Sequence, residues 1–154
     1  MWKYLPYTIV ILIFCTALQG WAYAHDQSTP EPTANSVDPG MNERVIRIPL
    51  RTGGYVRAIL GSPVQPKATI IMFPGGTGDI GLGQDGRIQH ADNFVMRTRE
   101  VWNRQGYAVL IPDTVNHLPL RGLRSSAHYA HLVEDIIAFV RRQDSGPVFL
   151  FGTS

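Results

Sequence analysis

The sequence predicts an α/β domain in which a mostly parallel sheet begins with an antiparallel hairpin and carries helices on both faces. Continuous apolar runs, typical of strands that are covered on both faces, occupy residues 68–73, 107–111 and 148–151. Segments with helical spacing of apolar residues lie between these runs, which implies parallel β-α-β crossovers. Two further apolar runs flank Gly53 and Gly54, as the strands of a β-hairpin do.

The composition is that of a globular protein. Apolar residues make up 44% of the chain and charged residues 17%, which excludes a disordered polyelectrolyte. The net charge of +2 is too small for a dedicated nucleic-acid surface, so we expect no nucleic-acid partner.

Residues 1–24 are typical of a secretory signal peptide. Lys3 supplies a positive start, residues 8–18 form an apolar run of 11 residues, and Ala22 and Ala24 place small side chains where a signal peptidase cleaves. We expect cleavage after Ala24, a secreted or periplasmic protein, and no stable membrane span afterwards. An uncleaved anchor is the alternative, but a spanning helix needs about 20 apolar residues. Cys15 is the only cysteine, so the mature chain would hold no disulfide.

The next segment, residues 25–42, contains three prolines and few apolar side chains. Such a segment buries too little surface to offset the entropy of ordering, so we expect a flexible linker followed by one domain over residues 43–154. The domain opens with the predicted hairpin, whose strands cover residues 45–50 and 55–60.

The remaining elements follow in alternation. The buried strand at 68–73 leads into a glycine-rich loop, and residues 92–105 have an imperfect helical pattern with Gly106 suited to the position after the helix. Pro112 ends the next strand. A second helix to about Gln143 can be capped by Ser125 or Ser126.

Two glycine-containing segments are candidates for chemistry. One is the loop Pro74-Gly75-Gly76-Thr77 after the third strand, and the other is the C-terminal Gly152-Thr153-Ser154 after the fifth. Together and in this order they resemble the α/β-hydrolase family, in which a sharp G-x-S-x-G turn exposes a nucleophilic serine after the fifth strand. The resemblance covers residues 43–154, although proline stands where the family's loop often has histidine.

The resemblance implies a serine hydrolase that cleaves esters or amides through an acyl-enzyme. Ser154 would be the nucleophile, and the N–H groups of Gly76 and Thr77 would face the oxyanion. The implied partner is a small-molecule ester or amide, as for an esterase, lipase or peptidase. No metal or organic cofactor is expected. The sheet order implied is first, second, fourth, third, fifth strand.

The sequence departs from this family in one respect. The family's acid and base follow the serine in the chain, whereas the histidines of the domain all precede Ser154 (His90, His117, His128 and His131). We therefore expect residues 1–154 to be the N-terminal part of a longer hydrolase, inactive by themselves.

A second hypothesis is a dinucleotide-binding domain of the Rossmann type. Gly76, Gly78 and Gly81 satisfy G-x-G-x-x-G after a strand and look like the glycine fingerprint of short-chain dehydrogenases. That motif requires a helix to start at once, and the further glycines at 83 and 86 disfavour this. A non-catalytic fragment or a binding protein on the same fold is a third hypothesis.

Several polar residues near these segments have simpler interpretations. We expect Asp79 to make a local turn bond, Asp113 to fix its loop, and Arg121 and Arg124 to be solvated loop charges.

A third polar group lies on the second predicted helix. His128, His131 and Asp135 share one helix face and could hold a metal, but a partly solvated polar face is the interpretation we favour.

Overall fold

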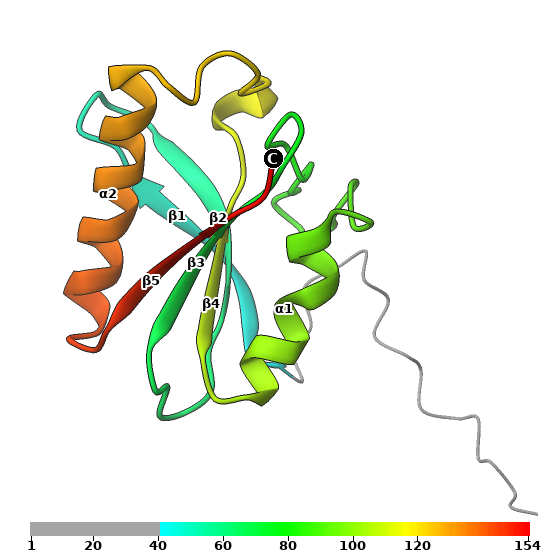
Figure 1. The fold of residues 1–154 in the computed structure, drawn as a ribbon, viewed down its shortest axis with the longest axis vertical. Coiled ribbons are helices and arrows are strands. Elements are labelled where there is room, and N and C mark those ends of the chain that lie inside the picture. The colour runs from blue at the N-terminus through cyan, green and yellow to red at the C-terminus, as the bar shows by residue number, and fades with distance from the viewer. Residues whose placement is uncertain (1–40) are drawn as a thin grey trace, which may run out of the picture. The chain divides into compact units, whose positions relative to one another are not determined.

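The computed structural model describes residues 41–154. The predicted signal peptide, its cleavage position, Cys15 and nearly all of the expected linker lie outside the described residues. The elements run in the order β1 (Glu43–Pro49), β2 (Tyr55–Gly61), β3 (Thr69–Phe73), α1 (Phe94–Arg104), β4 (Ala108–Pro112), η2 (Val115–His117), α2 (Ala127–Gln143) and β5 (Val148–Gly152) (Figure 1). Neither α-helix of this part of the chain combines the length and apolar character needed to cross a membrane.

The five strands form one mixed sheet in the order β1-β2-β4-β3-β5. This is the order that the sequence resemblance implied. The β1–β2 and β2–β4 pairs are antiparallel, whereas the β3–β4 and β3–β5 pairs are parallel. The expected α/β class is therefore confirmed, but the sheet is not mostly parallel. The antiparallel character extends beyond the hairpin, because β2 runs opposite to β4 as well as to β1.

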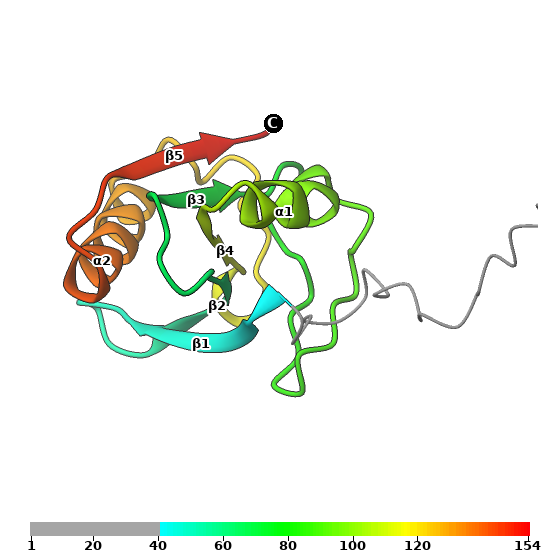
Figure 2. The same cartoon turned by 90° about the horizontal axis from the view of Figure 1, so that it is seen from below.

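The helices cover opposite faces of the sheet, as the sequence predicted (Figure 2). Successive side chains of a strand point to opposite faces. Ile70 and Met72 of β3 accordingly belong to the apolar core beneath α1, with Val95 and Met96 from that helix. Ile71 points the other way, into a second core that Ile136 and Val140 of α2 complete. This two-sided burial explains why β3 and β4 lack polar alternation.

The ends of the elements follow from local chemistry. Gly53 and Gly54 both have positive φ, at 88° and 76°, which the tight turn between β1 and β2 requires. The Ser126 hydroxyl accepts the Tyr129 N–H at 3.2 Å and begins α2. Asn93 begins α1 in the same way, so this helix starts two residues later than predicted.

A buried ion pair joins the first strand to the first helix. The Arg99 Nε lies 2.8 Å from Glu43 Oε1, and both side chains are almost fully buried. Arg99 also donates to the Met96 carbonyl at 2.7 Å. Since an unpaired charge in this position would be costly, the pair specifies how β1 sits beneath α1.

Candidate functional site

The C-terminal ends of β4, β3 and β5 meet at one edge of the sheet, where open α/β sheets bind ligands. In the parallel β3–β5 ladder, Phe73 is the partner of Gly152. The Thr153 N–H continues this pairing by donating to the Phe73 carbonyl at 3.3 Å. The loop after β3 and the segment after β5 therefore leave the sheet side by side, and the chain terminus lies next to this loop (Figure 1).

Ser154 lies directly against the glycine-rich loop. A Cβ built on Gly75 would be 2.9 Å from Thr153 Oγ1 and 3.2 Å from the backbone C and O of Ser154. The first distance is shorter than real Cβ contacts and the second is unusually tight, so a side chain at position 75 would force Thr153 or Ser154 to shift. The structure thus brings together two segments that the sequence analysis connected only by family resemblance, and Ser154 itself is exposed.

The backbone of residues 74–77 directs its carbonyl groups toward the protein. Arg124 donates to the carbonyls of Pro74 and Gly76, both at 2.9 Å. The Gly75 carbonyl accepts the Gly78 N–H, and the Thr77 carbonyl accepts the Leu120 N–H at 2.8 Å. No residue between 41 and 154 accepts a hydrogen bond from the Gly76 or Thr77 N–H. These two groups, on exposed residues, are left available to a ligand.

The expectation that Arg124 is a solvated loop charge is wrong. Its guanidinium is half-buried and bridges two carbonyls of the loop, a task for which a planar fork of donors is suited. The neighbouring Tyr129 hydroxyl is also shielded: burial raises its pKa, and the nearby Arg124 charge only partly opposes this. Arg121, in contrast, is exposed, as expected.

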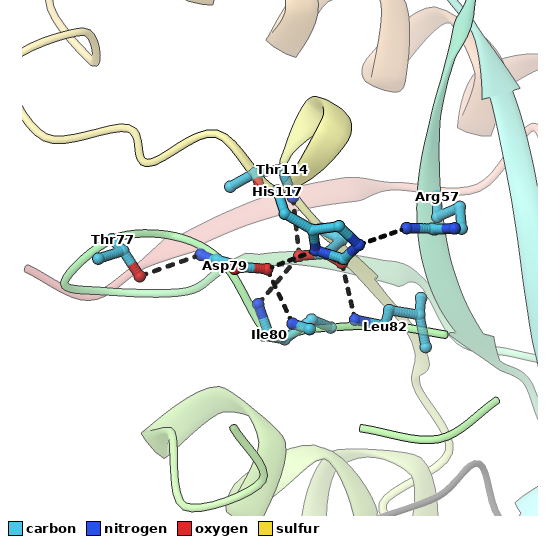
Figure 3. Close-up of polar contacts among 9 residues, drawn as sticks. Arg57, Thr77, Asp79, Ile80, Leu82, Thr114 and His117 are labelled. Carbon is cyan, nitrogen blue, oxygen red and sulfur yellow. Dashed lines mark hydrogen bonds and ion pairs between the residues drawn. The ribbon is translucent and has the colours of Figure 1, made fainter. Parts of the chain in front are cut away.

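Asp113 fixes its own loop after β4, as predicted, and also holds the glycine-rich loop, which the sequence did not indicate. Its side chain is completely buried, and its two oxygens accept the N–H groups of Ile80 (2.9 Å), Leu82 (2.8 Å) and Thr114 (2.8 Å) (Figure 3). Burial raises the pKa of Asp113, and the three backbone donors act in the opposite direction. The carboxylate is therefore a clamp that holds the end of β4 to residues 80–82.

Asp79 and His117 extend this clamp toward the surface. Asp79 accepts the Gly81 N–H at 2.9 Å, which is the local turn bond expected from the sequence. The His117 Nδ1 lies 3.1 Å from Asp79 Oδ1, and its Nε2 lies 2.7 Å from the Arg57 guanidinium (Figure 3). Arginine can only donate, so Nε2 is the acceptor and Nδ1 carries the proton.

The pKa of Asp79 reflects this environment. Burial by itself would raise it, but the hydrogen bonds from His117 and from the Gly81 N–H outweigh burial and lower it. Asn116 and His117 have positive φ, at 54° and 58°, which is uncommon for residues with side chains. The contacts to Asp79 and Arg57 keep the His117 ring in place despite this backbone conformation.

Asp79, Asp113 and His117 bring potential metal-ligating atoms within 4.8 Å of one another. Their existing bonds fit a clamp better than a metal centre. The Asp113 oxygens already accept three N–H groups, and the Arg57 cation occupies the other side of the His117 ring. A divalent cation would have to displace these partners.

The second potential metal group is part of a surface ion network. Arg51 lies 2.7 Å from Asp135 and 2.8 Å from Glu134, and His131 contacts the same glutamate at 3.3 Å. The Arg51 backbone N–H and guanidinium lower the pKa of Asp135. His131 and Asp135 therefore hold the hairpin turn against α2. This agrees with the partly solvated polar helix face favoured from the sequence, to which His128 also belongs.

The loop also lacks the geometry of a dinucleotide site. Gly76, Gly78 and Gly81 all have positive φ, but the next helix, α1, begins only at Phe94. No helix N-terminus follows the glycines at once to receive a pyrophosphate. The acid at the end of the next strand, Asp113, is buried and occupied by backbone donors, so it does not face a ribose.

No protein-family model, curated protein or solved structure matches this chain.

Proposed function

We propose that this chain carries the nucleophile and part of the oxyanion site of a serine hydrolase that acts on small-molecule esters or amides. The contact between Gly75 and the backbone of Ser154 is the observation that supports it most directly. The order of the strands and the placement of both segments at the C-terminal edge of the sheet agree with the resemblance to α/β-hydrolases.

The proposed reaction begins with attack of Ser154 Oγ on the carbonyl carbon of the substrate. Negative charge then develops on the carbonyl oxygen, and the N–H groups of Gly76 and Thr77 stabilise it. A base takes the serine proton during attack and gives it to the leaving alcohol or amine as this intermediate collapses. The ester left on Ser154 is then hydrolysed by water. The bonds from Arg124 keep the loop carbonyls turned away from the developing charge.

A serine needs a base to become an effective nucleophile. Within residues 41–154 no histidine is hydrogen-bonded to Ser154, and His117 is engaged with Asp79 and Arg57. We therefore expect residues 1–154 alone to hydrolyse p-nitrophenyl acetate no faster than background. A rate that disappears in Ser154→Ala would contradict this expectation.

The proposal is tested on the protein recovered from its own cell, with any residues that follow Ser154 left in place. A fluorophosphonate probe should label one serine, and mass spectrometry should find the adduct on the peptide that contains Ser154. Ser154→Ala should abolish labelling, whereas Ser125→Ala, which changes an exposed serine, should leave it intact. Gly75→Ala should also suppress labelling, because the new Cβ would displace Ser154. Labelling that survives Ser154→Ala would refute the proposed nucleophile.

We also propose that the protein is secreted or periplasmic, on the basis of the sequence pattern at residues 1–24. N-terminal sequencing of protein recovered from the cell envelope should begin at His25. Recovery of the intact chain from Met1 in membranes would reject cleavage after Ala24.

A further inference from the structure

An apolar hollow of about 280 Å³ lies beside the glycine-rich loop, between η2, the segment that follows it and the beginning of α2. Half of its lining residues are leucines, Leu118, Leu120, Leu123 and Leu132. The other lining residues are Val115, Ser126, His128 and Tyr129. Leu118 and Leu123 leave 61% and 52% of their surface exposed. The wall is therefore accessible from solvent as well as apolar.

The hollow lies next to the loop that carries the proposed oxyanion donors. The Leu120 N–H donates to the Thr77 carbonyl at 2.8 Å. A Cβ on Gly78 would lie 2.6 Å from Leu120 Cδ1, so the missing side chain lets this leucine pack against the loop. A narrow space lined by Pro74 and Gly78 shares Leu120 and Tyr129 with the larger hollow. The hollow and the loop are therefore neighbours, with Leu120 in contact with both.

The lining determines the chemistry of the occupant. Its wall is almost entirely hydrocarbon and contains no carboxylate, lysine or arginine. Sugars, phosphates and charged peptides would lose hydration there without gaining partners. An aliphatic chain, in contrast, gains free energy from each methylene that it buries.

We propose that this hollow binds the acyl chain of the ester substrate, with the substrate carbonyl at the N–H groups of Gly76 and Thr77. This inference rests on the proposed hydrolase function and adds a substrate class to it: esters of unbranched, medium-length aliphatic acids. The hollow distinguishes long from short acyl chains by the number of methylenes that they bury. We therefore expect kcat/KM to increase about fourfold for each added methylene until the hollow is filled.

The test uses the protein recovered from its own cell, with any residues that follow Ser154 left in place, and the p-nitrophenyl esters of acetate, butyrate, hexanoate and octanoate. The unaltered protein should prefer the longer acyl groups. Leu123→Trp fills the hollow and should reduce kcat/KM for the octanoate ester at least tenfold. Val64→Trp is the matched control, because Val64 is 96% exposed on the loop between β2 and β3, and it should keep the original preference.

A binding measurement separates this inference from the hydrolase function. Octanoate should bind to Ser154→Ala in a calorimetric titration, and the added change Leu123→Trp should weaken binding at least tenfold. Ester hydrolysis without a chain-length preference, or equal behaviour of Leu123→Trp and Val64→Trp, would overturn the acyl site and leave the hydrolase standing. Octanoate binding that depends on Leu123, without Ser154-dependent hydrolysis, would instead support the hollow and refute the hydrolase. If the only effect of Leu123→Trp were loss of dimerisation or of vesicle binding, the leucines would be covered by a second protein copy or by a membrane, and the acyl site would be refuted.

Discussion

Removal of the Asp113 carboxylate should loosen the glycine-rich loop and destabilise the domain. In Asp113→Ala, three buried N–H groups lose a charged acceptor. A hydrogen bond to a charged group contributes about 1.5–3 kcal/mol. Part of this loss is recovered, because burial of the carboxylate itself opposes folding and water can enter the vacated space. We therefore expect the free energy of unfolding to fall by about 3 kcal/mol, the typical cost of leaving buried donors unsatisfied.

The assay is urea unfolding, followed by tryptophan fluorescence at submicromolar concentration to limit association. With a denaturant slope of about 1–3 kcal/mol per molar urea, the midpoint should shift by roughly 1–3 M. Asp85→Ala is the matched control, because Asp85 also accepts a backbone N–H in this loop, at 3.1 Å, but its side chain is mostly exposed. The control should stay within about 0.5 kcal/mol of the original.

Amide hydrogen exchange supplies a second, local measurement. The N–H groups of Ile80 and Leu82 should exchange faster in Asp113→Ala than in the original chain, whereas the amides of β1 should exchange at a rate set by the global loss of stability. Equal midpoints for Asp113→Ala and Asp85→Ala, with unchanged exchange at Ile80, would refute the clamp.

Three further outcomes are expected. Light scattering on refolded residues 25–154 should show large, polydisperse species, because edge strand β5 (Val148–Gly152) exposes Phe149 and Leu150 and holds no charge. Leu150→Lys should reduce the amount of these species. A monodisperse monomer of the unaltered chain would contradict the prediction. The lowered pKa of Asp79 means that its stabilising effect is present above about pH 3.9 and is lost as the pH falls through the lower folded-state pKa. A carboxyl NMR titration should show this low midpoint, with a higher one in His117→Ala. Arg124→Lys keeps the charge but loses the two-pronged bridge, so fluorophosphonate labelling should slow about tenfold or more; unchanged labelling would exclude a positioning role.

The fold could be predicted largely from local patterns. The buried runs that became β3 and β4 have no polar alternation because both of their faces are covered, and this is visible in the sequence. The apolar run at residues 148–151 predicted the same for β5, but there Phe149 and Leu150 are exposed. Two features escaped prediction because they depend on pairing between distant segments. One is the antiparallel register of β2 with β4. The other is the short η2, which carries Asn116 and His117 in the left-handed region without a glycine to signal it.

The candidate site was predictable only in part. The glycines beside Ser154 could be identified because glycine is needed where backbones approach closely. Arg57 and Arg124 could not, since their partners lie 60 and 48 residues away in the chain and an arginine in a polar segment is usually solvated. Their roles depend on the tertiary contacts that bring the hairpin and the segment before α2 to the loop.

The position of β3 between β4 and β5 has a consequence for biosynthesis. Both of its hydrogen-bonding edges are completed by strands that are synthesised later, β4 and then β5. At a synthesis rate of roughly 5–20 residues per second, β5 is complete roughly 4–16 s after β3. During that interval an apolar strand with an unpaired edge is available to other nascent chains. Chaperones that bind short apolar segments of nascent chains would therefore find a binding site in β3.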